Sequence, residues 1–514
     1  MTENSSSLLS WIIFTPLLFG ILLLCLPKKF EQYFRHLALV AGMANLLFAI
    51  KLWSNFDGAI STMQFVQSIP WIPKLGISYL LGVDGISLPL VMLTAIITPI
   101  AILGTWPHDL SKLKQEKFFV LMVLALQTGM YGTFLASDIF LFYFFWEIVL
   151  IPMFFLIGIW GGAERIYATI KFFLYTMVGS LLMLVAIWWM IYRYKQGFGV
   201  PSASFADLAR VQYNFVDESW MKAIFSEQGL LFLAFTLAFV IKVPMVPFHT
   251  WLPDAHVQAP TLGSVFLAAV LLKLGTYGLM RISMPMFPEA AYYFSMMMMG
   301  FGVIGVVYGA FCAWGQSDFK KLVAYSSVSH MGYILVGLFS FNQVAIAGSL
   351  YQMINHGISS AGLFMVVGFL YERLHTRNLD DFGNIAKVAP LMAIGFMILT
   401  LSSVALPGTN GFVGEFTILF GTFQAQPAVA LIAGLGVIFG AIYALKAYQR
   451  VMFGPLTNDH NKNVVDLSVR EFLAMGVLAI FIFGIGFFPG SFFGKSDTTL
   501  SVYSQQLIEK VIHE

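Results

Sequence analysis

Long apolar stretches, separated by short polar segments, follow one another along almost the whole chain. About fourteen of them come close to the roughly 20 residues that a helix needs to cross a membrane. They lie at about 8–27, 36–53, 79–105, 116–136, 138–160, 168–192, 226–248, 258–283, 293–314, 320–340, 344–371, 388–421, 428–450 and 468–490. The pattern predicts an all-α integral membrane protein with about fourteen transmembrane helices.

Two of the predicted helices are interrupted by proline. The seventh contains Pro244 and Pro247 directly after Lys242, and the twelfth contains Pro407 followed by Gly408. A proline removes one N–H donor and leaves a carbonyl without its partner, which a membrane tolerates only where protein or cavity water replaces the donor. We therefore expect water to enter at the carbonyls freed near Pro244 and Pro247.

The two breaks lie five helices apart, which predicts two five-helix units, helices 4–8 and 9–13. Because five is odd, the second unit would be inverted in the membrane, as in many transporters. Asp138 and Asp318 stand at corresponding junctions and support this pairing. The predicted organisation is an N-terminal segment of three helices at 1–110, a first unit at 111–285, a second unit at 286–452, and a last helix with its tail at 453–514.

Composition and charge narrow the class of protein. The 514 residues are 59% hydrophobic and only 11% charged, whereas a soluble domain is about 25% charged. A net charge of +2 excludes nucleic-acid binding as the main role. Cys25 and Cys312 are too few for an iron–sulfur cluster or a disulfide scaffold.

Loop charge predicts the orientation. Lys and Arg are about twice as frequent on one set of helix flanks as on the other, and the richer set should face the cytoplasm. Both termini then lie on the opposite, periplasmic side.

Several ionisable residues lie inside apolar spans, where each costs about 2.5–3.5 kcal/mol on insertion scales. They are Glu147, Lys242, Lys273, His330, His356 and Glu415. Any one of them could serve packing alone, but six together favour a path for protons. A Glu147–Lys242 ion pair would keep Lys242 protonated, and separating the two would favour release of its proton.

Two other motifs have structural interpretations. The histidines of the 249–256 stretch fit no usual zinc spacing, so we interpret this stretch as a turn that caps the eighth helix. Gly300, Gly302 and Gly305 follow no predicted strand, which indicates close helix packing rather than a dinucleotide site.

Several motifs resemble a known family. They are Trp146-Glu147 followed by Pro152, the run 242–256, Gln258-Ala259-Pro260-Thr261, and residues 322–330. These motifs resemble those of the antiporter-like membrane subunits of respiratory complex I, and the resemblance extends over about residues 8–490. Subunits of Mrp-type cation/proton antiporters and of membrane-bound hydrogenases are similar as well.

The resemblance implies a role for each buried ionisable residue. Glu147 would partner Lys242, Lys273 would connect the central charged axis, His330 would relay protons, His356 would be its polar neighbour, and Glu415 would face the outer half-channel or the next subunit. It also implies a bacterial inner membrane and a place among L-type and N-type antiporter-like neighbours, small membrane subunits and a peripheral arm. NADH, FMN, iron–sulfur clusters and quinone would be bound by those partners, with no cofactor or metal on this chain.

Two alternatives remain. The chain could belong to an Mrp-type Na⁺/H⁺ antiporter or a membrane-bound hydrogenase, although Glu415 stands where several related chains carry lysine and argues against the antiporter. It could also be a structural scaffold, in which case Glu147→Gln and Lys242→Ala would leave turnover and pumping intact.

Overall fold

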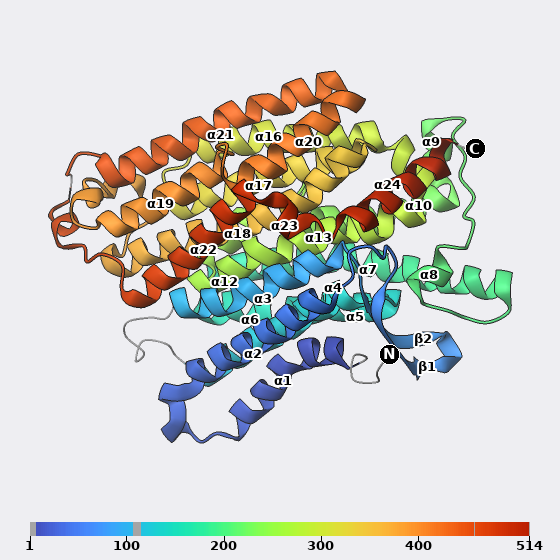
Figure 1. Ribbon diagram of the computed structural model, residues 1–514, viewed down its shortest axis with the longest axis horizontal. Helices are drawn as coiled ribbons and strands as arrows, with labels where there is room; N and C mark the ends of the chain where they lie inside the picture. Colours follow the sequence, from blue (N-terminus) through green and yellow to red (C-terminus); the bar gives the residue numbers. More distant parts are fainter. Residues whose placement is uncertain (1–6, 106–114, 457, 513–514) are drawn as a thin grey trace.

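The computed structural model describes residues 7–105, 115–456 and 458–512, and most of its helices run side by side in one bundle (Figure 1). Twelve stretches of described helix are long and apolar enough to cross a membrane. They are α1 (Leu8–Cys25), α2 (Phe34–Asn55), α3 (Ser87–Gly104), α4 (Glu116–Leu135), α5 with α6 (Ile139–Ile148 and Leu150–Trp160), α7 (Arg165–Phe198), the run from α12 to α14 (Thr261–Met286), α16 (Ser295–Trp314), α17 (Phe319–Phe339), α18 (Gln343–Leu374), α21 (Pro427–Phe453) and α22 (Val469–Phe487).

The seventh and twelfth predicted spans are not among these twelve because both are broken, as their prolines predict. In the seventh, predicted at 226–248, the helix α10 (Glu227–Lys242) ends at the break, and α11 (Trp251–Gln258) follows beyond the predicted range. The twelfth, predicted at 388–421, consists of α19 (Pro390–Ser403) and α20 (Asn410–Ala425). Each piece is shorter than a full span. The structure therefore has twelve continuous spans among its described residues where the sequence predicted about fourteen, and the two broken helices account for the difference.

Protein donors occupy two carbonyls at the first break. The Val240 carbonyl, which Pro244 deprives of its usual donor, accepts the Met245 N–H at 2.9 Å. The Ile241 carbonyl accepts the indole N–H of Trp251 at 2.8 Å. The chain itself therefore supplies one donor to each of these two carbonyls, and the entry of water near Pro244 and Pro247 stays a prediction.

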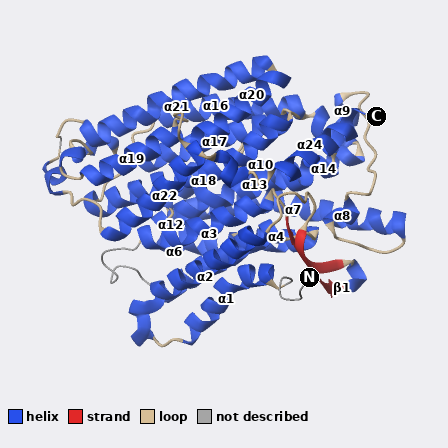
Figure 2. Ribbon diagram, viewed as in Figure 1, coloured by secondary structure: helices blue, strands red, loops and turns tan. Residues whose placement is uncertain are grey.

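The expectation of an all-α protein is wrong in one place. Strands β1 (Gln64–Ile72) and β2 (Ile77–Val83) form an antiparallel hairpin (Figure 2), so the third apolar stretch, predicted from 79, begins as a strand. The turn ends at Gly76, whose φ of 69° is the left-handed conformation that glycine adopts most easily.

Shorter elements complete the chain. The short α-helices are α8 (Phe205–Leu208), α9 (Trp220–Phe225), α13 (Leu272–Gly278), α14 (Met284–Met286), α15 (Pro288–Tyr293), α23 (Pro489–Phe493) and α24 (Asp497–Ile512). The 3₁₀-helices are η2 (Lys28–Tyr33), η3 (Pro73–Leu75), η7 (Leu379–Asp381), η8 (Ile385–Lys387) and η9 (Asp459–Asn463). Two π-helical turns, η5 (Leu267–Leu271) and η6 (Leu279–Ser283), lie on either side of α13.

Asp138 and Asp318 occupy equivalent structural positions. The Asp138 carboxylate accepts the N–H groups of the first turn of α5, and the Asp318 carboxylate accepts an N–H in the first turn of α17. Each residue also forms an isolated β-bridge to a loop, Asp138 with Ser204 and Asp318 with Asn378. An aspartate that caps the helix and forms a β-bridge therefore begins a helix in both predicted units.

A buried ion pair ties the loop before α3 to the π-turn η6. Arg281 lies 2.6 Å from Asp84, and both side chains are almost fully buried. Burial alone would raise the pKa of Asp84, but the charge and hydrogen bond of Arg281 and two backbone N–H donors bring it below its usual value. Asp84 is therefore held as a carboxylate at neutral pH.

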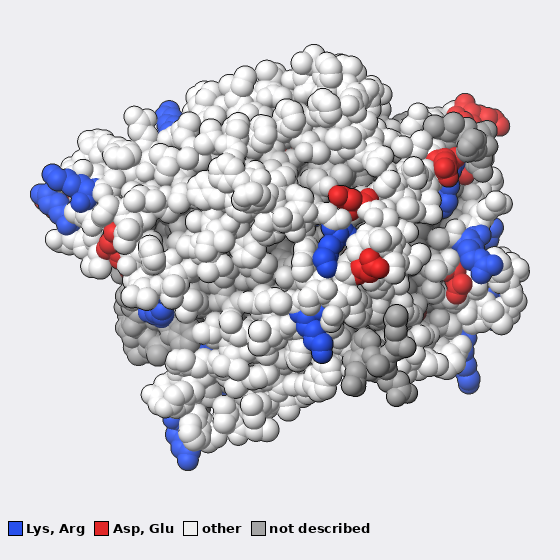
Figure 3. Space-filling view, in the orientation of Figure 1, with Lys and Arg blue, Asp and Glu red and all other residues white. Residues whose placement is uncertain are grey.

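The helices differ in how far they are enclosed. The most apolar windows of Thr261–Met286 and of α18 are fully buried, whereas only 22% of the α21 window and 33% of the α7 window are buried. The face in Figure 3 is largely uncharged, and most of its charged side chains lie toward the left and right ends of the view. A belt of exposed apolar side chains thus surrounds a core built on α12 to α14, α17 and α18.

Candidate functional site

Lys273, in α13, is the first member of a buried polar network. Its Nζ donates to the Ala268 carbonyl in the π-turn η5 at 2.5 Å and lies 2.7 Å from Nδ1 of His356, in α18. The other ring nitrogen of His356 lies 3.1 Å from the Ser327 hydroxyl, in α17. Lys273 is completely buried, so its ammonium group depends on these partners for solvation.

Close backbone packing sets this geometry. A Cβ atom on Gly357 would lie 2.9 Å from the Ala269 carbonyl, so α18 approaches η5 at a distance that only glycine permits. This contact brings His356, the preceding residue, against Lys273. π-Helical turns are found frequently at functional sites, and here such a turn supplies the carbonyl that Lys273 binds.

His330 and Glu415 form the second part of the network. Nδ1 of His330, in α17, lies 2.7 Å from a carboxylate oxygen of Glu415, in α20. The same oxygen accepts the side-chain N–H of Gln352 at 3.0 Å. Nε2 of His330 lies 3.2 Å from the Ser403 hydroxyl, at the second helix break. Glu415 is therefore fixed by two helices other than its own.

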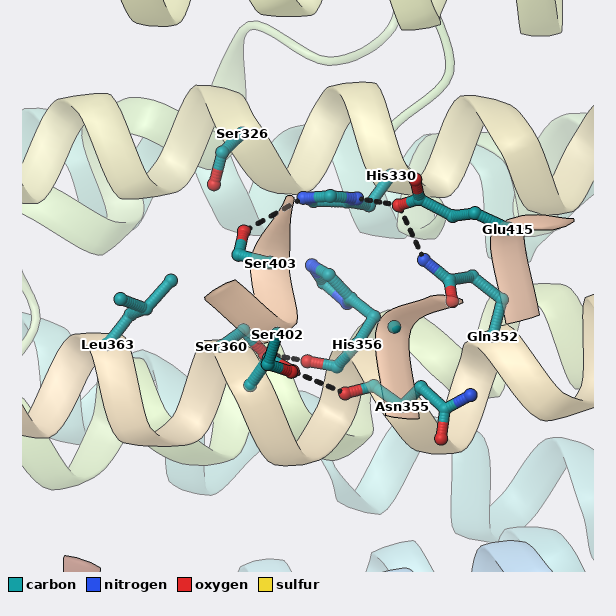
Figure 4. A pocket seen from close by; sticks show the side chains of 12 residues that line it. Ser326, His330, Gln352, Asn355, His356, Ser360, Leu363, Ser402, Ser403 and Glu415 are labelled. Atoms are coloured by element: carbon teal, nitrogen blue, oxygen red, sulfur yellow. Dashed lines mark hydrogen bonds and ion pairs between the residues drawn. The ribbon is translucent and has the colours of Figure 1, made fainter. Parts of the chain in front are cut away.

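The two parts meet at a small polar cavity (Figure 4). The ring centroids of His330 and His356 lie 5.4 Å apart, and among the described residues no hydrogen bond joins the two rings. The cavity between them has a volume of about 10 Å³, close to what one water molecule needs. It is lined by Ser326, His330, Gln352, Asn355, His356, Ser359, Ser360, Leu363, Ser402, Ser403, Gly411 and Glu415.

Glu147 and Lys242 lie outside this network. No described ion pair joins them, and an oxygen of Glu147 has no hydrogen-bond partner in the described chain. Lys242 Nζ instead lies 3.8 Å from the ring centroid of Trp146, where the electron-rich face of an indole attracts a cation. The direct ion pair is therefore not formed in this structure, and Lys242 lies instead over the ring of Trp146, the residue next to Glu147.

Sequence reasoning missed the polar residues around the cavity. Ser402 lies 2.5 Å from Ser359 and donates at 2.5 Å to Asn410, at the start of α20. Both side-chain polar atoms of Asn355 are buried without a hydrogen-bond partner in the described chain. The available signal was adjacent serines within apolar helices, Ser326-Ser327 and Ser359-Ser360, which place hydroxyls on neighbouring faces.

The stretch with two histidines is a helix and not only a turn. Residues Trp251–Gln258 form α11, so our turn interpretation is wrong for most of the stretch. His249 and His256 are buried, and none of their ring nitrogens has a hydrogen-bond partner among the described residues. The ring of His256 stacks on Phe364 at 4.3 Å. Within the described ranges, no group of three or more His, Cys, Asp or Glu residues could hold a metal ion.

The contacts of the network constrain where protons can lie. The short Lys273–His356 contact needs one donor and one acceptor: either a protonated Nδ1 donates to a neutral Lys273 amine, or an ammonium Lys273 donates to an unprotonated Nδ1. Transfer of that proton to Nδ1 leaves a neutral amine and an imidazolium. At the other end, an N–H at Nδ1 of His330 would donate to the Glu415 carboxylate. Each half can therefore hold or pass one proton without a large movement of the chain.

Comparison with known proteins gives the family. Residues 36–133 match the family described as "NADH-ubiquinone oxidoreductase chain 4, amino terminus", and residues 136–440 match "NADH:quinone oxidoreductase/Mrp antiporter, TM". NADH-quinone oxidoreductase subunit M of Rhodobacter capsulatus is 44% identical over 487 residues, which are 94% of this chain and 93% of that protein. The chain belongs to the NADH-quinone oxidoreductase subunit M family. The resemblance drawn from the sequence motifs is confirmed.

Solved structures agree with membership of the subunit M family. A chain of respiratory complex I from Thermus thermophilus with bound NADH matches with a TM-score of 0.85 and 30% identity, covering 97% of this chain and 99% of that one. A chain of the Mrp complex from Dietzia sp. matches with a TM-score of 0.82 and 19% identity over 100% of both chains, which shows a shared fold alone.

Proposed function

We propose that this chain translocates protons through a bacterial inner membrane as a membrane subunit of NADH:quinone oxidoreductase, complex I. The observation that carries the proposal is the buried network in which Lys273, His356, His330 and Glu415 meet from four helical segments. Ionisable groups inside a membrane protein mark ion and proton paths by default, and these four lie end to end.

The remaining two site residues extend the path. Lys242 ends α10 directly before the first break, and Glu147 lies in a neighbouring helix with an oxygen free to accept a proton. Lys242 Nζ lies over the ring of Trp146 and forms no ion pair with Glu147 in this structure. A change at the break that closes this gap would form the ion pair and favour a protonated Lys242, and reopening would favour release.

Other subunits of the complex would carry the redox chemistry. Partner subunits, including L-type and N-type antiporter-like neighbours, small membrane subunits and a peripheral arm, would bind NADH, FMN, iron–sulfur clusters and quinone. The equivalent helix caps and β-bridges of Asp138 and Asp318 support two related five-helix units, at 111–285 and 286–452. The boundary near residue 110 lies outside the described residues.

In the proposed topology, both termini face the periplasm. Lys112 and Lys114 contribute to that charge bias and also lie outside the described residues.

The decisive experiment is Lys273→Met in the assembled complex, reconstituted in vesicles. Methionine keeps much of the side-chain length and removes the ammonium. We expect NADH-driven acidification to be largely lost, because the network then has no cation at this end. Lys446→Met is the matched control, since Lys446 is an exposed lysine in α21, and it should pump normally.

The outcomes separate the proposal from its alternatives. Normal pumping by an assembled Lys273→Met complex would refute the proton path and favour a scaffold. An Na⁺/H⁺ antiporter would exchange the two ions in vesicles without NADH, and such sodium-dependent exchange from the wild-type assembly would also refute the proposal. The Mrp-like fold is the observation that keeps this second candidate in the test.

A further inference from the structure

A large apolar groove, separate from the polar cavity, is lined by residues of α2, α3, α22 and α23, and α3 lies next to both α2 and α22 (Figure 1). Its volume is about 710 Å³, within the range of about 300–1,000 Å³ typical of small-molecule sites. Apart from Trp53 and Ser491, every side chain that lines it is hydrocarbon or thioether. An occupant must therefore be mostly hydrocarbon.

The groove has the length of a lipid chain. Along α3 its lining runs from Pro89 to Leu103, which is about 21 Å at 1.5 Å per residue. That is more than half of the roughly 30 Å hydrocarbon core of a bilayer. Ile354 and Ile358 of α18 form part of its floor. The groove therefore runs along the membrane-spanning direction, beside the helix that carries His356.

Lys495, at one end of the groove, keeps one N–H donor available. Lys495 Nζ donates to the carbonyls of Trp53 and Phe56, at 2.5 and 2.8 Å, and lies 5.5 Å from the Trp53 ring centroid. An ammonium group has three N–H donors, so one remains. Among the described residues, no carboxylate forms an ion pair with Lys495. Lys51, exposed near the same end of α2, adds a second positive charge.

These features together select one class of occupant. Trp53, the nearby basic residues and the apolar channel reproduce the arrangement found where a membrane meets its headgroups, with indole and lysine at the interface and hydrocarbon below. We propose that the groove binds an anionic phospholipid, with its phosphate at Lys495 and Lys51 and an acyl chain along α2, α3 and α22. This lipid would fill the space behind α18.

The test uses the intact complex in nanodiscs that contain a phosphatidylglycerol with a photoreactive group near the end of one acyl chain. After illumination and digestion, we expect labelled peptides from α2, α3 and α22. Lys495→Gln should lower this labelling about five-fold, the change that corresponds to about 1 kcal/mol per basic residue at an anionic surface. Val477→Trp, which fills the groove from α22, should nearly abolish it.

Two controls share the chemistry of the variants but not their position. Lys446→Gln and Leu435→Trp change exposed residues of α21 and should leave labelling of the groove unchanged. Equal labelling by a phosphatidylcholine probe would overturn the preference for an anionic lipid. Wild-type labelling in Val477→Trp, or crosslinks from the groove to another subunit in place of lipid, would overturn the site itself. None of these readouts depends on proton pumping.

Discussion

Glu415→Gln separates the charge of this residue from its shape. A glutamine can still accept hydrogen bonds from His330 and Gln352, which lie 2.7 and 3.0 Å from the same carboxylate oxygen. The fold around α20 should therefore persist. What is lost is the negative charge 2.7 Å from Nδ1 of His330.

The magnitude follows from the type of hydrogen bond. A hydrogen bond to a charged group contributes about 1.5–3 kcal/mol, and one between neutral groups about 0.5–1.5 kcal/mol. The substitution should therefore weaken the hydrogen bond between His330 and residue 415 by about 1–1.5 kcal/mol, which corresponds to a factor of about five to ten. If transfer through His330 limits pumping, the rate of NADH-driven acidification should fall by a similar factor.

A double-mutant cycle tests whether the two residues act as one unit. Glu415→Gln, His330→Gln and the double variant are compared in assembled complexes, with vesicle acidification and NADH oxidation measured together. Coupled residues should give a double variant hardly worse than the worse single variant. Glu164→Gln, at an exposed carboxylate before α7, is the control. Wild-type pumping by Glu415→Gln, or fully multiplicative losses in the double variant, would refute the reasoning.

Two further substitutions test a buried ion pair and a hydrogen bond that support the structure around the site. Asp84→Asn leaves Arg281 buried without its counter-charge and should lower the stability of the complex by about 3–5 kcal/mol. Because the pKa of Asp84 is lowered, the stabilisation by the Asp84–Arg281 ion pair is lost only as the pH falls through that lowered value. The denaturation temperature should therefore show no dependence on pH from this ion pair between about pH 6 and 8. Trp251→Phe removes the donor to the Ile241 carbonyl and should lower the stability by about 1–3 kcal/mol, which is measured as a lower denaturation temperature. Trp314→Phe changes an exposed tryptophan, and an equal fall in its denaturation temperature would contradict this prediction.

The sequence was most informative about features that the membrane environment constrains directly. Apolar length predicted the spans, and Pro244 and Pro407 predicted where two helices break. The cost of burying charge selected Lys273, His330, His356 and Glu415, and the structure places all four in or beside one polar cluster. These expectations rest on properties that each segment has by itself.

The contacts within the site could not be derived in this way. Lys273 and His356 are 83 positions apart, and His330 and Glu415 are 85 apart, so their meeting depends on how whole helices pack. The same limit applies to Glu147 and Lys242, since nothing local shows that the ammonium of Lys242 lies over the ring of Trp146 in this structure. The hairpin was missed because the alternating apolar residues of 77–83 adjoin an apolar helix and merge with it in a hydropathy average.

The separation between His330 and His356 has a consequence for energy conservation. A proton that returns across the membrane dissipates about 2.3 kcal/mol for each 100 mV of potential. With the two rings 5.4 Å apart and unconnected by a hydrogen bond, a proton on Lys273 or His356 has no direct route to Glu415. One water molecule in the cavity would complete that route. Hydration of a space of about 10 Å³ would thus decide between an insulated resting state and a conducting one, and a substitution that enlarges this cavity would be expected to produce a proton leak.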